Sequence, residues 1–242
     1  MLTLGIDLAS QNENTAACLV EWSGGEVILR ELLDRGSDDE LVARMRAVRD
    51  AGGCIGIDAP FGWPEAYLAA MTSWREEGRF PPTDSKDLAF RLTDRKEYLA
   101  KKQPLSVSSD RIAYVAWRCA RLLTRFFEGA PTSRLGPTVV EVYPGASMAS
   151  WGLGAQGYKQ SEPTRKKLLL ELNAKGLRWV SDEAQQSALT RSEHLFDAFI
   201  ASLSTRAFQI KRCDPIPAAH QAVAEREGWI MLPGASSLAK LA

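Results

Sequence analysis

The first sixty residues show apolar runs separated by turns, a pattern that predicts strands. Apolar residues dominate 2–8 and 15–22, and Ser23-Gly24-Gly25 joins the second run to a third at 26–32. Two apolar runs linked by a short glycine turn are typical of a β-hairpin. We therefore expect three strands, of which the last two are antiparallel neighbours.

A helix and a fourth strand follow. Ser37 and Glu40 have the spacing of a capping box, which satisfies free backbone N–H groups at a helix start. Four apolar residues then repeat at helical spacing before Gly52-Gly53 ends the pattern: Leu41, Val42, Met45 and Val48. The run CIGIDA at 54–59 is short, apolar and closed by an acid, which favours a buried parallel strand.

The remaining chain predicts an inserted segment and then further helices and a strand. Residues 60–107 hold five prolines and one possible helix at 64–77; they are too few and too polar for a core of their own. Beyond them the patterns predict helices at 109–128, 161–175 and 191–208, the last capped by Thr190 with Glu193, and strands at 138–144 and 228–232. We expect one α/β domain over 1–242 with a mixed sheet: three antiparallel strands, then parallel ones, flanked by helices.

Four acids stand in apolar surroundings: Asp7, Asp58, Glu141 and Asp197. A buried carboxylate needs a cation, backbone donors or a metal ion. Asp7 and Asp58 each close a strand, and ligands bind at the carboxyl ends of parallel strands. A carboxylate cluster without many histidines suits Mg²⁺ or Mn²⁺, and two such ions about 4 Å apart can hydrolyse a phosphodiester. The pattern thus points to phosphoryl chemistry.

Simpler interpretations stay open for these acids. Asp7 and Asp58 could cap a turn or a helix, and Glu141 could face solvent from an edge strand. Glu193 is most simply a capping residue.

The acid of the last predicted helix has its own alternatives. Asp197 could pair with Arg191 or Arg206 near the helix surface. His194 shares the helical face of Asp197, and it could either bind a metal or satisfy a hydrogen bond in the core.

With these positions in place, the sequence resembles the DUF429 family, described as predicted nucleases with an RNase H-like fold. Six segments carry the resemblance: GIDLAS (5–10), IGIDAPFGWP (55–64), FRLTD (90–94), SSDRIAYVAW (108–117), VVEVYPGAS (139–147) and EHLFDAFIAS (193–202). The resemblance implies a sheet whose first and fourth strands are adjacent, with Asp7, Asp58 and Asp197 as the shared metal ligands. It also places Glu141 on the fifth strand as a further candidate metal ligand. Many nucleases of this fold take no ligand from that strand, so the alternative is an auxiliary or family-specific role for Glu141.

The resemblance also implies further functional residues. EHLFDA is similar to the last motif of Holliday-junction resolvases, in which an acid or a histidine stands three residues before the final Asp; His194 holds that place. The matching segments 90–94 and 108–117 contain Arg91, Thr93, Asp94 and Arg111. An arginine beside a metal site could clamp a phosphate and Thr93 could hydrogen-bond it, although these residues could equally form a polar helix start.

Charge limits how this protein could bind nucleic acid, whether DNA or RNA. Thirty Lys plus Arg balance thirty Asp plus Glu, which excludes a uniformly basic protein. The balance is uneven: residues 1–90 carry a net charge of −8 and residues 91–125 one of +6. Arg111, Arg118 and Arg125 recur every seven residues and predict a stripe that a phosphate backbone could follow, with Trp74 or Trp117 for base stacking. The same stripe could be an ordinary solvated face.

Composition excludes some other classes. Four cysteines without C-x-x-C spacing and two histidines disfavour a disulfide scaffold and a zinc finger. The first residues lack a basic segment followed by a long apolar one, and no window is apolar enough to span a bilayer. We expect a reduced, cytoplasmic protein with no membrane association; the residues do not indicate an oligomeric state.

Three functions remain. The first is a Mg²⁺- or Mn²⁺-dependent nuclease with Asp7, Asp58 and Asp197 as ligands, helped by Glu141 and His194. The second is a nucleotide-dependent phosphotransferase of the actin-like or sugar-kinase type, although the chain shows no obvious Gly-rich adenine-binding segment. The third is a binding module of the same fold without catalysis.

Overall fold

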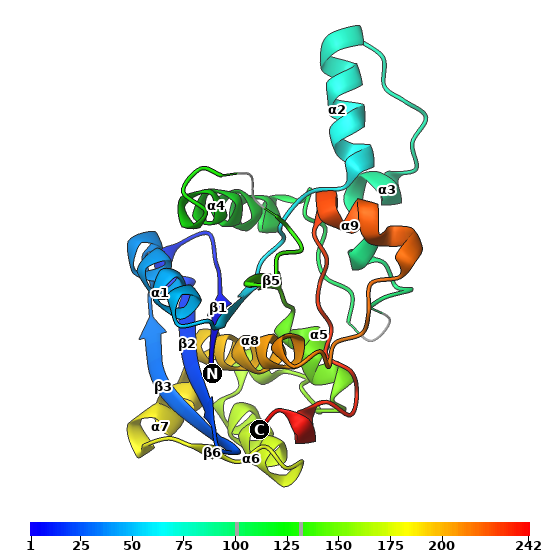
Figure 1. Ribbon diagram of the computed structural model, residues 1–242. Helices are drawn as coiled ribbons and strands as arrows, with labels where there is room; N and C mark the ends of the chain where they lie inside the picture. Colours follow the sequence, from blue (N-terminus) through cyan, green and yellow to red (C-terminus); the bar gives the residue numbers. More distant parts are fainter. Residues whose placement is uncertain (100–101, 131–132) are drawn as a thin grey trace.

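A computed structural model describes residues 1–99, 102–130 and 133–242 of the chain. They form an α/β fold around a mixed six-stranded sheet with the strand order β5-β4-β1-β2-β3-β6 (Figure 1). The strands are β1 (Leu2–Asp7), β2 (Ala16–Ser23), β3 (Glu26–Asp34), β4 (Cys54–Asp58), β5 (Val139–Glu141) and β6 (Trp179–Val180). The first three are antiparallel, whereas β4 runs parallel to β1, β5 to β4, and β6 to β3. The predicted α/β class and mixed sheet are confirmed.

Helices cover both faces of the sheet. On one face α1 (Asp38–Asp50) and α4 (Asp110–Phe126) bury their apolar sides against Leu4, Ile6 and Ile57. The other face holds the long α8 (Glu193–Gln209), with α5 (Pro144–Ser150), α6 (Glu162–Ala174) and α7 (Glu183–Arg191) beyond it. The predicted capping box of Ser37 and Glu40 is present at the start of α1.

Two glycines bring α8 unusually close to the sheet. A side-chain carbon at Gly5 of β1 would overlap the backbone of Ala198 and Ser202, and one at Gly56 of β4 would overlap the Thr205 hydroxyl. A glycine inside a strand often marks such a close approach. Because α8 lies directly on these strands, side chains from its first turns reach the carboxyl ends of β1 and β4.

The inserted segment after β4 contains two helices, α2 (Glu65–Glu77) and α3 (Ser85–Ala89), followed by the single turn η2 (Leu92–Asp94). Figure 1 shows α2 projecting away from the sheet and its helices. The helix predicted at 64–77 is confirmed, with Pro64 as its N-cap. Residues 100–101 of the predicted insertion lie outside the described residues.

Three predicted elements differ from the structure, and α7 was not predicted. β5 has three residues rather than seven, because Pro144 opens α5 instead of merely ending a strand. Residues 228–232 form no strand and contribute only an isolated bridge from Ile230 to Glu141.

The other two differences concern helices. Thr190 lies within α7, a helix the pattern did not predict, and Ser192 caps α8 by accepting a hydrogen bond from the Leu195 amide. Among the described helices, none is long and apolar enough to cross a bilayer.

Candidate functional site

Asp7 and Asp58 lie side by side at the carboxyl ends of adjacent parallel strands. They are register partners at the last pair of β1 and β4. Side chains alternate along a strand, so Asp7 shares the face of Gly5, and Asp58 that of Gly56, the face that α8 covers. Asp197, in the second turn of α8, is 1% exposed and completes a group of three carboxylates.

Two of the three carboxylates have protein partners. An Asp7 oxygen lies 2.8 Å from Nδ1 of His194. Asp197 accepts a hydrogen bond from the Tyr158 hydroxyl at 2.8 Å and pairs with Lys159 Nζ at 3.0 Å. The Asp58 carboxylate makes no hydrogen bond and no ion pair with any residue that the structure describes.

The three acids repel one another. Burial, followed by the charges of Asp7 and Asp197, raises the pKa of Asp58 well above its usual range. Burial and the charge of Asp7 raise the pKa of Asp197 to about 6, against the opposing effect of Lys159 and Tyr158. The cluster therefore holds more negative charge than its protein partners neutralise.

Lys159 and Tyr158 belong to a one-turn helix, η3 (Tyr158–Gln160), between α5 and α6. Burial lowers the pKa of Lys159, but Asp197 and Asp7 outweigh it and leave the pKa raised, so the ammonium stays charged. Burial and Asp197 raise the pKa of the Tyr158 hydroxyl, which therefore remains a donor. The hydrogen bond to Asp7 raises the pKa of His194, against partial burial.

A cavity of about 260 Å³ opens onto this group. Asp7, Asp58 and Lys159 contribute its charged lining nearest the strand ends, and Tyr143 lies beside them. Leu105 of the insertion and Ile112 of α4 add apolar wall. The cavity thus combines polar groups at one end with apolar sides, as small-ligand sites do.

Glu141 leaves the sheet on the opposite face from Asp58. It is the register partner of Ile57, one residue before Asp58, so alternation points it away from α8. Although β5 is an edge strand, Glu141 is 2% exposed. Its two oxygens accept hydrogen bonds from Arg91 at 2.6 and 2.8 Å, and one also accepts from the Phe61 amide. Burial raises the pKa of Glu141, partly offset by Arg91.

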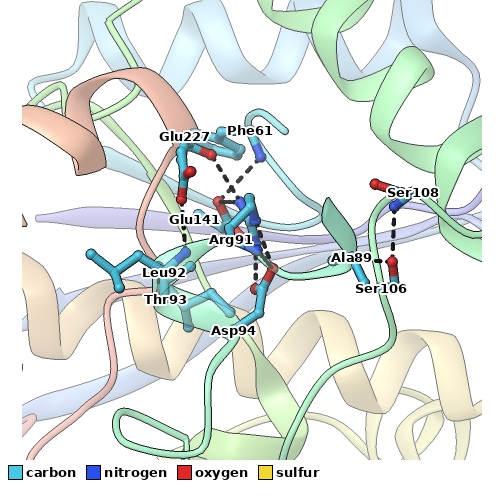
Figure 2. A network of polar contacts seen from close by, with 11 residues as sticks. Phe61, Ala89, Arg91, Leu92, Thr93, Asp94, Ser106, Ser108, Glu141 and Glu227 are labelled. Atoms are coloured by element: carbon cyan, nitrogen blue, oxygen red, sulfur yellow. Dashed lines mark hydrogen bonds and ion pairs between the residues drawn. The ribbon is translucent and has the colours of Figure 1, made fainter. Parts of the chain in front are cut away.

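Arg91 is the centre of a buried polar network (Figure 2). It is 2% exposed and donates to both oxygens of Asp94 as well as to Glu141. Its remaining bond reaches the Glu227 carbonyl, and the Glu227 carboxylate accepts from the Leu92 amide. The network joins the insertion, β5 and the C-terminal segment of the chain.

A family model described as "Protein of unknown function (DUF429)" matches residues 5–222. The chain belongs to the DUF429 family. Neither a curated protein nor a solved structure matches it. The family assignment expected from the motifs is thereby confirmed, and any function of this DUF429 chain has to be argued from its own residues.

Two of the predicted substrate-binding residues of this DUF429 chain, Arg91 and Asp94, line the cavity, whereas the other three are dispersed. Thr93 is buried, and its hydroxyl accepts a hydrogen bond from the Ile230 amide at 3.1 Å. Arg111 is exposed on the first turn of α4. Arg118 is 4% exposed and donates to Asp38, Thr15 and the backbone of the β1–β2 loop, so it fixes the loop that follows Asp7.

A metal ion requires a different arrangement of these acids from the one described. Over residues 1–99, 102–130 and 133–242, no three His, Cys, Asp or Glu side chains are grouped as a ready ligand set. The donor chemistry nevertheless fits a hard cation, because three carboxylates meet and one of them lacks a partner. Lys159 occupies one oxygen of Asp197 in the present arrangement.

Sequence reasoning missed Tyr158, Lys159 and Tyr143. None belongs to a periodic pattern, and η3 lies in a turn after Gly157, whose φ is +74°. The one available signal was that a buried Asp197 needs a cation, and the chain offers thirty. The partners predicted as alternatives, Arg191 and Arg206, do not pair with Asp197; Arg206 donates to the Leu241 carbonyl instead.

Proposed function

We propose that this DUF429 protein is a divalent-cation-dependent phosphodiesterase, a nuclease with an RNase H-like fold. One observation carries the proposal: Asp7 of β1 and Asp58 of β4 line a cavity, the buried Asp197 of α8 lies beside them, and the Asp58 side chain has no partner in the described structure. Such clusters of perturbed acids in a cavity are typical of functional sites.

The order of strands supports the fold part of the proposal. An RNase H-like sheet begins with three antiparallel strands and places the first strand beside the fourth. Here β1 lies between β2 and β4, and the closing helix α8 packs on β1. This arrangement agrees with the family resemblance of the motifs around Asp7, Asp58 and Asp197.

Asp7, Asp58 and Asp197 would hold Mg²⁺ or Mn²⁺ through their oxygens. A bound divalent cation supplies Lewis acidity to a phosphodiester and to the attacking water. Around it the protein contributes fixed groups. His194 holds the Asp7 carboxylate, and Tyr158 holds that of Asp197. Lys159 lines the cavity as a half-exposed cation, and it is placed to donate a hydrogen bond to a phosphate oxygen.

Glu141 and Arg91 take a supporting part in this proposal. Both Glu141 oxygens are engaged by Arg91, and the Phe61 amide that donates to Glu141 lies three residues after Asp58. The pair therefore fixes the path of the chain that leaves the end of β4. Arg91 and Glu141 also line the cavity, but their polar atoms are engaged with each other, so their main contribution is to position Asp58.

A cleavage assay tests the proposal. The purified protein is incubated with Mn²⁺ or Mg²⁺ and single-stranded, duplex or branched substrates, beside Asp7→Asn, Asp58→Asn and the control Asp34→Asn. Asp34 is exposed at the end of β3, two strands away from Asp7, and is not among the residues that line the cavity. We expect hydrolysis by the wild type and the control, and a loss of at least a hundredfold in the two site variants.

Each contrary result has a clear meaning. Activity that persists in Asp7→Asn and Asp58→Asn overturns the assignment of the site. Absence of cleavage on every substrate, together with Mn²⁺-dependent thermal stabilisation, favours the binding module, because a bound ion stabilises only the folded state. Calorimetric binding of Mg-ATP in place of cleavage favours the phosphotransferase.

A further inference from the structure

Helix α4 exposes two aromatic side chains next to each other. Tyr114 is 60% exposed and Trp117 is 47% exposed. Burying such large aromatic side chains would be favourable, so their exposure is costly. Their rings lie edge to face, with centroids 5.2 Å apart and planes at 71°. In such a pair one ring contributes only its edge, so the pair leaves both faces of that ring uncovered.

Two arginines without ion-pair partners flank this pair. Arg111 and Arg121 are exposed on the same side of α4, and neither makes an ion pair with a described residue. The other two arginines of the helix are engaged: Arg118 is paired with Asp38 and Arg125 with Asp39. The only acid in α4 is Asp110, which accepts a hydrogen bond from a backbone amide in the first turn.

The surface of α2 offers a contrast. Its exposed apolar residues, Leu68, Met71 and Trp74, share the helix with three glutamates and one arginine, and that arginine, Arg75, is paired with Glu76. The helix therefore carries a net negative charge and offers an anion no unpaired arginine. Trp74 is 58% exposed, so exposure alone does not distinguish it from Trp117. The difference lies in the charge beside the aromatic ring.

The aromatic face of α4 is connected to the carboxylate cavity. Ile112 and Val115 of the same helix line that cavity with Asp7 and Asp58. At 100° per residue, Arg111 lies between these two residues and Tyr114 around the helix. The four side chains from Arg111 to Arg121 cover about 15 Å of helix length. A strand on this surface would pass Arg111 before it reached the cavity.

We propose that Arg111, Tyr114, Trp117 and Arg121 form a binding surface for single-stranded nucleic acid, which delivers the strand to the carboxylate cavity. Bases stack on the aromatic rings while phosphates contact the two arginines, the combination by which proteins hold single strands without reading their sequence. The single strand is favoured over a duplex because stacking requires an unpaired base face. The role of this surface in binding a substrate rests on the proposed nuclease function.

Binding without catalysis tests this surface. The full chain in EDTA is titrated against a fluorescently labelled single-stranded 12-mer and its duplex, and anisotropy is recorded from low to moderate salt. The variants are Trp117→Ala and the double variant Arg111→Gln/Arg121→Gln, with Trp74→Ala as the matched control. Thermal melting of each variant verifies that it is folded.

We expect the single strand to bind more tightly than the duplex. Trp117→Ala should weaken binding at least fivefold, which corresponds to one lost base stack. The double arginine variant should reduce the slope of log K against log salt by about 1.4, which is about 0.7 for each phosphate contact on a single strand. Trp74→Ala should bind as the wild type does.

Several results overturn the surface. These are equal affinity of folded Trp117→Ala and wild type, preference for the duplex, or a change of oligomeric state in Trp117→Ala that identifies the face as a protein interface. Tight binding in EDTA combined with no cleavage under any metal condition would support the surface and remove only the nuclease. Cleavage by the wild type, with unchanged affinity in all variants, would support the nuclease and overturn only the surface.

Discussion

Asp7 and Asp58 are register partners at the ends of two parallel strands, and both side chains leave the sheet on the face covered by α8. This places two acids together for reasons of topology alone, because the carboxyl ends of neighbouring parallel strands meet. Asp197 joins them only because glycines in both strands let the helix come close. The strand ends and the helix contact are thus parts of one arrangement.

The first prediction concerns the charge of Asp58. Burial and the neighbouring acids raise its pKa, so its ionised form destabilises the folded protein. The stabilising protonated form is present at low pH and is lost as the pH rises through the raised folded-state pKa. Asp58→Asn imitates the protonated form. In EDTA at pH 8 it should raise the Tm by about 2–4 °C, roughly 1 kcal/mol in a domain of this size.

The gain in Asp58→Asn should shrink as the pH falls toward 4, where the wild-type carboxyl is itself protonated. Asp34→Asn, which changes an exposed acid, should leave the Tm unaltered at both pH values. Thermal melting followed by circular dichroism gives both numbers. A lower Tm for Asp58→Asn at pH 8 would show that the carboxylate has a stabilising partner.

The second prediction concerns the two strand glycines. Gly5→Ala would force a methyl group into the backbone of α8, whereas Gly56→Ala would meet the buried hydroxyl of Thr205, a side chain rather than backbone. Overpacking costs about 1–3 kcal/mol and more where backbone must shift. Gly5→Ala should therefore cost about 3 kcal/mol or more in urea unfolding and exceed Gly56→Ala. Gly154→Ala, where nothing lies within 4 Å, should change stability by less than about 0.5 kcal/mol.

The third prediction concerns the buried Arg91 network. Arg91→Met leaves two buried carboxylates, Glu141 and Asp94, without their cation. Breaking a buried ion pair by removing one partner costs about 3–5 kcal/mol. In urea unfolding, Arg91→Met should lose an unfolding free energy in that range. Glu141→Gln should lose less, since the glutamine leaves Arg91 paired with Asp94.

Arg95 supplies the control for that network. It lies four residues away, and its ion pair with Asp87 is exposed on both sides, so Arg95→Met should cost less than about 1 kcal/mol. Equal losses for Arg91→Met and Arg95→Met would contradict the interpretation that burial, rather than pairing alone, makes the network stabilising.

The fourth prediction concerns Lys159. The lysine neutralises Asp197, so Lys159→Met leaves the three acids more negative and frees the oxygen that the ammonium occupies. Titration calorimetry should show Mn²⁺ binding about tenfold more tightly, an effect of roughly 1.4 kcal/mol. Cleavage should slow, because the variant loses the ammonium group that we propose to contact the phosphate. Lys167→Met, at an exposed pair on α6, should leave both properties unchanged. Weaker Mn²⁺ binding in Lys159→Met would refute this reading of the cluster.

Local patterns were sufficient to predict much of the sheet and the position of two acids. The strands that end at Asp7 and Asp58 were identified because each is a short apolar run closed by an acid and a turn. Ser37 and Glu40 were identified as a capping box because the motif is complete within four residues. These features depend only on residues that are close together in the sequence, so one amino-acid sequence is enough to recognise them.

Contacts between segments that are far apart in the sequence could not be predicted from local patterns. Whether Glu141 faces Asp58 depends on a one-residue register between β4 and β5, because a shift of one residue exchanges the two faces of a strand. Arg118 was predicted to form a stripe with Arg111 and Arg125, either for a phosphate backbone or as a solvated face, but it is buried and holds a loop about a hundred residues earlier in the chain. Thr190 was predicted as the N-cap of α8, but it belongs to α7, and Ser192 caps α8.

The most direct measurement is the anomalous scattering of Mn²⁺ in crystals of the protein grown or soaked with the ion. If the cluster is a divalent-cation site, we expect an anomalous peak between the carboxylates of Asp7 and Asp58, within coordination distance of both. This peak should disappear in Asp58→Asn crystals treated in the same way. Saturating Mn²⁺ without a peak at these strand ends, and with Lys159 still paired to Asp197, would contradict the proposal that this carboxylate cluster is a divalent-cation site.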